Sequence, residues 1–156
     1  MKKNIFLMLL FAGMILLCGC QATYSVAPAG RGDNGNVVFT RPVEYHWGFG
    51  SYSSRELVEI TYCTFRTNEA GQKVAEVGIR FHGPNDWFNW WKKAPEQISI
   101  GSKCQFYEGA LEHSRIIYET NNQNIVIKLG ETYAYKAVCP RSDAKSFQLV
   151  LNGYSE

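Results

Sequence analysis

Alternation of apolar and polar residues, the pattern of a half-buried β-strand, dominates the chain beyond residue 36. The clearest examples are residues 56–67 and 74–82, and Asn-Glu-Ala-Gly at residues 68–71 supplies a turn between them. Apolar residues of the second segment occupy every other position, at Val77, Ile79 and Phe81. The two segments are therefore predicted to form a β-hairpin.

Both phases of the first segment carry apolar residues. One phase holds Val58, Ile60 and Tyr62, and the other holds Leu57, Cys63 and Phe65. The alternation predicts a strand here without showing which of the two faces is buried.

Shorter segments of the same kind continue along the chain. Further strands are predicted at residues 37–41, 97–100, 103–107, 115–119, 124–129, 132–139 and 146–151. Short strands separated by turn residues at this spacing are typical of an all-β fold. The predicted fold class is all-β, an antiparallel β-sandwich of immunoglobulin-like or flattened-barrel form, built by residues 37–156.

Residues 83–95 break the alternation. The segment has Asn85 and Asp86 at its start, two lysines near its end and Pro95 after them. Such caps predict one short helix. Trp87 and Trp91 lie four residues apart in this Trp-rich segment and would share a face of the helix.

Residues 45–52 form a second aromatic-rich stretch, which is predicted to be a loop. Aromatic side chains stack on sugar rings and dominate contacts between proteins. The two stretches supply a candidate binding surface made of Trp47, Tyr52, Trp87, Trp90 and Trp91. In the alternative interpretation, which applies most to Trp87 and Trp91, these bulky residues seal one end of the core.

The first twenty residues carry a different pattern. Lys2 and Lys3 precede an apolar run at residues 5–17, which is about 13 residues long, whereas a membrane-spanning helix needs roughly 20. This combination is typical of a secretory signal. The run ends in Leu17-Cys18-Gly19-Cys20, which resembles the lipobox read by the lipoprotein signal peptidase. The resemblance implies cleavage after Gly19 and attachment of diacylglycerol and an N-acyl chain such as palmitate to Cys20.

The resemblance divides the chain into three parts. These are a signal peptide at residues 1–19, a lipidated cysteine with a flexible tether at residues 20–36, and the sandwich domain at residues 37–156. In Gram-negative lipoproteins an aspartate after the cysteine favours the inner membrane, and here the residue is Gln21. The implied location is the cell envelope, with a lipid anchor in the outer membrane and the domain in the periplasm.

Charge and chemistry narrow the classes of function. Removal of residues 1–19 takes away two of the 16 basic residues and none of the 14 acidic ones, which leaves 14 of each. This balance offers no footprint for nucleic acid. His46, His82 and His113 lack the spacing of metal ligands, and no nucleophile motif is present. No catalytic residue, metal or other cofactor is predicted, and a histidine and an acid at residues 82–86 are the nearest approach to a site.

Three cysteines remain for the folded domain: Cys63, Cys104 and Cys139. Disulfides persist outside the cytoplasm. Cys104 and Cys139 each share a strand face with aromatic residues and are predicted to point inward, which favours a disulfide between them. Closing this loop of about 35 residues would stabilise the fold by roughly 3–4 kcal/mol. Cys63 would then be a buried free thiol, and the other two pairings stay open.

Features of the mature chain together resemble a known family. A lipobox, a tether ending at residues 31–37, a small all-β domain and the stretch at residues 127–133 are similar to the periplasmic immunity lipoproteins of type VI secretion clusters. That resemblance implies a protein that binds and neutralises a toxic effector. The predicted function is a non-catalytic protein-binding module, an immunity or inhibitor protein attached to the membrane. The alternatives are a binder of cell-wall glycan or peptidoglycan and a structural component of the envelope.

Overall fold

The structure is a computed structural model of the chain. It describes residues 24–26, 34–41, 44–47, 50–53, 57–83, 95–110 and 114–153. Within these ranges the chain forms eleven β-strands and no helix. The strands are β1 (Tyr24–Val26), β2 (Gly35–Arg41), β3 (Glu44–Trp47), β4 (Gly50–Ser53), β5 (Val58–Thr67), β6 (Lys73–Phe81), β7 (Gln97–Tyr107), β8 (Ile116–Glu119), β9 (Gln123–Lys128), β10 (Thr132–Cys139) and β11 (Ser146–Gly153).

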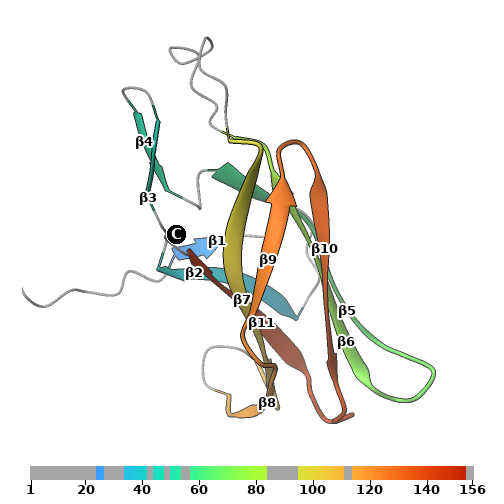
Figure 1. Cartoon of the computed structure of the whole chain (residues 1–156). Coiled ribbons are helices and arrows are strands. Elements are labelled where there is room, and N and C mark those ends of the chain that lie inside the picture. The colour runs from blue at the N-terminus through green and yellow to red at the C-terminus, as the bar shows by residue number, and fades with distance from the viewer. Residues whose placement is uncertain are drawn as a thin grey trace, which may run out of the picture.

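Two main sheets form a sandwich-like arrangement (Figure 1). The larger sheet has six strands in the order β1-β2-β11-β7-β8, with β9 also paired to β7, and the smaller sheet has the order β10-β6-β5. All paired strands are antiparallel except β2 and β11, which are parallel. The all-β prediction is confirmed, whereas the expectation of a purely antiparallel fold is wrong for this pair.

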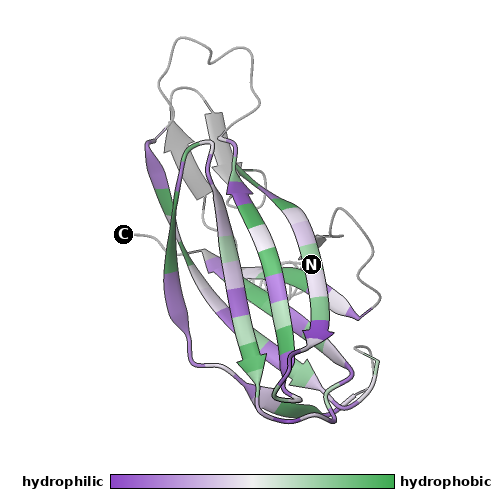
Figure 2. Cartoon of the chain, turned by 90° about the vertical axis from the view of Figure 1, so that its right-hand side faces the viewer, coloured by the Kyte–Doolittle hydropathy of each residue, from purple (hydrophilic) through white to green (hydrophobic). Residues whose placement is uncertain are grey.

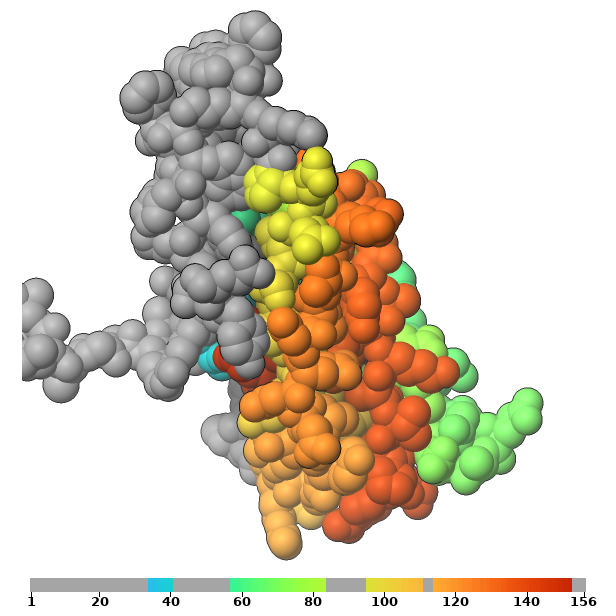
Figure 3. Space-filling view, in the orientation of Figure 1, coloured from blue at the N-terminus to red at the C-terminus, as the bar shows by residue number. Residues whose placement is uncertain are grey.

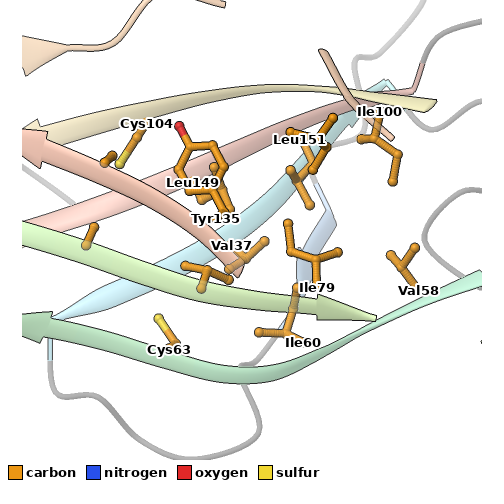
Figure 4. Packing of buried hydrophobic residues seen from close by; sticks show 14 of the residues in the cluster. Val37, Val58, Ile60, Cys63, Ile79, Ile100, Cys104, Tyr135, Leu149 and Leu151 are labelled. Carbon is orange, nitrogen blue, oxygen red and sulfur yellow. The ribbon is translucent and has the colours of Figure 1, made fainter. Parts of the chain in front are cut away.

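The hydrophobic core lies between the two sheets. Along β10 the side chains alternate between exposed and buried positions, and Figure 2 shows the same alternation of hydrophobic and hydrophilic residues along the strands. Side chains from both sheets meet in the interior, as Figure 4 shows for Leu149 of β11 and Ile79 of β6. The alternation in the sequence therefore arises because each main sheet buries one face against the core and exposes the other to solvent.

The hairpin predicted at residues 56–82 is present as β5 and β6. Its register runs from Val58 opposite Phe81 to Thr67 opposite Lys73. In the turn the N–H of Gly71 donates to the carbonyl of Asn68 at 3.0 Å, and Gly71 has a φ of 77°, which glycine adopts without steric cost. The tip of this hairpin projects from the body of the molecule (Figure 3).

A β-bulge in β5 explains why the sequence showed apolar residues in both phases. Thr61 is the extra residue, because Ile60 pairs with Ile79 and Tyr62 pairs with Gly78. The bulge moves the inward phase by one position. Tyr62 is therefore 37% exposed, whereas Cys63 is only 5% exposed.

The two strands predicted at residues 97–100 and 103–107 are one continuous strand, β7. β8 and β9 share one edge of β7, with a break between them at residues 120–122. Thr120 bridges the break: its N–H donates to the carbonyl of Cys104, and its Oγ1 accepts from the N–H of Cys104, both at 2.9 Å. The long strand therefore keeps its backbone partners where the neighbouring strand is interrupted.

Part of the segment at residues 20–36, which is predicted to be a flexible tether, forms regular structure. β1 pairs with β2, with Val26 opposite Val37, and β2 begins at Gly35 rather than at residue 37. A Cβ on Gly35 would lie 2.4 Å from the ring of Phe147 and 2.7 Å from the Sγ of Cys63. Only glycine fits at this point, because both neighbours are buried in the core.

Candidate functional site

The aromatic stretch at residues 45–52, expected to be a loop, is a β-hairpin. β3 and β4 pair with Tyr45 opposite Tyr52 and Trp47 opposite Gly50. The two residues between these strands, 48 and 49, lie outside the described residues. The error arose because the polar positions of the stretch are few, so the alternation is weak.

The register of this hairpin brings two predicted site positions together. Positions 45 and 52 are opposite each other, and position 47 lies two residues along the strand from position 45. Because strand positions alternate between faces, positions 45, 47 and 52 share one face, and His46 and Ser51 occupy positions on the other. The predicted grouping of Trp47 with Tyr52 is therefore consistent with the backbone.

Several predicted site residues lie outside the described residues. These are Cys20, which is predicted to be lipidated, and the three tryptophans of the Trp-rich segment, Trp87, Trp90 and Trp91.

The disulfide predicted between Cys104 and Cys139 is not formed in the structure. All three domain cysteines are free and buried, so their predicted inward orientation is correct. Cys104 belongs to β7 in the larger sheet and Cys139 ends β10 in the smaller one. Facing sheets lie about 10 Å apart, whereas a disulfide needs Cα atoms within about 7 Å. An inward orientation from two sheets does not by itself bring two sulfur atoms together.

Burial makes these thiols poor nucleophiles. It raises the pKa of the Cys63 thiol to about 11 and raises the pKa of Cys104 further, where Cys139 and Cys63 add a smaller effect of the same sign. The thiolate, which is the reactive form, is therefore scarce at neutral pH.

His82 belongs to residues 82–86, the stretch of the sequence that comes nearest to a catalytic site. Its backbone N–H donates to the carbonyl of Leu57 at 3.0 Å. The Nδ1 of its ring is buried without a hydrogen-bond partner among the described residues. The acid of this stretch, Asp86, lies outside the described residues. No cluster of three or more potential metal ligands occurs in the part of the chain that the structure describes.

A hollow of about 540 Å³ at one end of the sandwich is a feature that the sequence did not indicate. Four separate segments of the chain meet there, and three of its lining residues are basic. It is lined by Asn34, Phe65, Arg66, Thr67, Lys73, Gly109, Ala110, Ala144 and Lys145. No sequence signal could have found it, because its basic residues are up to 79 positions apart, from Arg66 to Lys145.

Solved structures that align with this chain include two bacterial proteins. A DUF1425 family member from Shewanella sp. pv-4 aligns with a TM-score of 0.51 at 14% identity, over 75% of this chain and 93% of that one. The crystal structure of Campylobacter jejuni cj0090 aligns with a TM-score of 0.47 at 17% identity, over 67% of this chain and 94% of that one. No family model and no curated protein matches the sequence. At 14% identity the likeness to the Shewanella protein concerns the fold alone.

The described residues contain no helix that is long and apolar enough to cross a membrane.

Proposed function

We propose that the chain is a membrane-anchored lipoprotein whose β-sandwich domain is a non-catalytic protein-binding module in the periplasm. Cys20 carries the lipid anchor in the outer membrane, and the partner is a protein that the domain neutralises, as an immunity or inhibitor protein does. The proposal includes the short Trp-rich helix at residues 83–95 as a second part of the binding surface. It draws the anchor from the lipobox and the binding role from the β3–β4 hairpin.

The hairpin is the observation that carries the binding role. β3 and β4 form a two-stranded sheet that is hydrogen-bonded to neither main sheet among the described strands, and Figure 1 shows them standing apart from the sandwich. A lone two-stranded hairpin is marginally stable in water. Contact with a partner would bury it, and Tyr and Trp are the residue types that most often dominate binding energy.

The hairpin supplies its own matched control for a binding experiment. Trp47→Ala with Tyr52→Ala alters two positions on one face, and His46→Ala with Ser51→Ala alters a registered pair on the other face. Each double variant of the lipoprotein would be crosslinked in intact envelopes, recovered and analysed by mass spectrometry. We expect the wild type and the His46/Ser51 variant to recover one protein in stoichiometric amount.

The Trp47/Tyr52 variant is expected to lose that partner. Removal of two aromatic anchors weakens binding by about 2 kcal/mol or more, which is roughly 30-fold. Equal recovery of the partner by both double variants would show that the hairpin face is not the binding surface. If only muropeptides are recovered, and the Trp47/Tyr52 variant loses them, the partner is cell-wall glycan and not a protein.

The lipid anchor has a separate test. Metabolic labelling with radioactive palmitate is expected to be abolished by Cys20→Ser and retained by Cys18→Ser, because Leu17 before Cys18 is too large for the peptidase. Label that persists in the Cys20→Ser variant would refute the assignment of the anchor.

A further inference from the structure

We propose that the hollow at the end of the sandwich is an oxyanion site, which binds a phosphate or carboxylate group carried on a small apolar body. The β5–β6 turn, the β7–β8 connection and the β10–β11 connection gather at this end, which is the lower end in Figure 1. Asn34, directly before β2, completes the rim. The site is distinct from the β3–β4 hairpin and goes beyond the proposed function.

Hydrogen bonds to the sheet hold the walls of the hollow in place. The buried hydroxyl of Ser146 donates to the carbonyl of Gly109 at 2.5 Å. The N–H of Lys145 donates to the carbonyl of Tyr107 at 2.8 Å, and the N–H of Phe147 donates to the carbonyl of Asn34 at 2.9 Å. Three of the contributing segments are thus tied to strands of the larger sheet, so the hollow is largely formed before a ligand enters.

The floor of the hollow is apolar. The half-buried ring of Phe65 packs on Phe147 with centroids 5.5 Å apart and on Phe106 at 6.3 Å. Ala144, which also lines the hollow, is 1% exposed. Phe65 therefore has one side fixed by the core and lines the hollow with the rest, which suits a ligand that carries an apolar portion.

The rim of the hollow is cationic. Lys73 lies with its Nζ 5.9 Å from the centroid of Phe65 and 2.8 Å from the Oγ1 of Thr67. Lys145, in the β10–β11 connection, is exposed. Neither lysine makes an ion pair with any described residue, and no acid is among the lining residues. Within the part of the chain that the structure describes, these two positive charges beside an apolar floor are thus left without an ion-pair partner.

Arg66 adds a third, partly balanced charge. Its Nη2 lies 2.9 Å from the Oε1 of Glu76, which also lies 3.6 Å from the Nζ of Lys136. The hydrogen bond from Arg66 is the main reason that the pKa of Glu76 is lowered. Because Arg66 and Lys136 share one carboxylate, Arg66 keeps part of its attraction for a second oxyanion.

The chemistry of the ligand follows from these groups. Lysines act as point charges toward phosphate and carboxylate oxygens, and an arginine adds directed N–H donors. Because the mature chain is predicted to carry equal numbers of basic and acidic residues, a local excess of cations comes from their placement. Attraction between exposed charges is screened by salt, so binding should weaken as ionic strength rises.

Phenyl phosphate is the probe for this site, because it joins an oxyanion to an apolar ring. Isothermal titration of the full lipoprotein in a nonionic detergent is expected to show saturable one-to-one binding. Lys73→Met with Lys145→Met removes both unpaired charges and keeps the apolar stems, and should weaken binding at least about tenfold. Lys128→Met is the matched control, since Lys128 is an exposed lysine of β9 that does not line the hollow.

The control should bind phenyl phosphate within about twofold of the wild type. If the Lys73/Lys145 variant and the control lose affinity equally, the effect is one of general surface charge and the proposal is overturned. Absence of saturable binding to the wild type would overturn it as well. If inorganic phosphate binds as tightly as phenyl phosphate, the inference that the ligand carries an apolar portion is refuted.

Two further arms separate this site from other causes. Water-soluble dihexanoyl phosphatidylglycerol that competes with phenyl phosphate would support the site and assign a lipid headgroup as the source. Lack of competition, with phenyl phosphate still bound, would support the site and assign a soluble ligand. The Trp47/Tyr52 variant should bind phenyl phosphate normally, so failure of the hairpin proposal leaves this one standing.

Discussion

Replacement of Phe147 by alanine is expected to lower the free energy of unfolding by about 3–5 kcal/mol, the usual effect of removing a buried aromatic ring. The side chain is fully buried. It contacts Phe65 and Phe106 at centroid distances of 5.5 and 6.4 Å, and Gly35 packs against its ring. These neighbours belong to β5, β7 and β2, which lie in two different sheets. They therefore cannot move together to fill the cavity that the missing ring would leave.

Urea unfolding followed by circular dichroism measures this effect. Val126→Ala is the control, because Val126 is 49% exposed and should change stability by only about 0.5 kcal/mol or less. The two variants should share the m-value of the wild type if only the folded state is affected. A Phe147→Ala midpoint close to that of Val126→Ala would contradict the packing described for this ring.

The second large effect is a loss of stability in alkali that depends on Tyr135. Burial raises the pKa of this phenol to about 12, against hydrogen bonds from Thr120 and Gln123 that act the other way. An unfolded tyrosine has a pKa of about 10. Because the folded pKa is the higher one, the stabilisation is complete below pH ~10 and is lost as pH rises through 10 to 12. The loss should reach about 2–3 kcal/mol at the upper end.

Tyr135→Phe should flatten this part of the pH profile. The buried thiols contribute a loss of the same sign from lower pH, because burial raises the pKa of Cys63 to about 11 as well. That contribution is common to wild type and variant, so the difference between their unfolding free energies isolates the phenol. At neutral pH the variant should be less stable, since it leaves Thr120 and Gln123 without this partner. Parallel profiles between pH 10 and 12 would refute the assignment.

Local pattern was sufficient where alternation was strong and turn residues followed it. β10 begins and ends at the residues predicted for it, and its buried positions, such as Tyr135 and Ala137, lie in one phase. The β5–β6 hairpin was equally accessible, because Gly71 permits the positive φ that its turn requires.

Errors arose where the pairing between strands, and not the local pattern, decided the structure. The bulge at Thr61 changed the buried face of β5, and no local signal distinguishes a bulge from a regular strand. Two other features depend on segments that are far apart in the sequence. These are the parallel pairing of β2 with β11 and the placement of Cys104 and Cys139 in different sheets. The same reason hid the hollow, since Lys73 and Lys145 come together only when β6 and the β10–β11 connection are in place.

The position of β11 has a consequence for how the domain can form. The last strand that the structure describes lies in the middle of the larger sheet, between β2 and β7, and Thr40 and Asn152 form a side-chain hydrogen bond across 112 positions. Until β11 emerges from the ribosome, β2 and β7 each present an open edge to other chains. Folding of this sheet is therefore a late, slow event with high contact order. A nascent chain held unfolded until that point by chaperones would be protected from edge-to-edge aggregation.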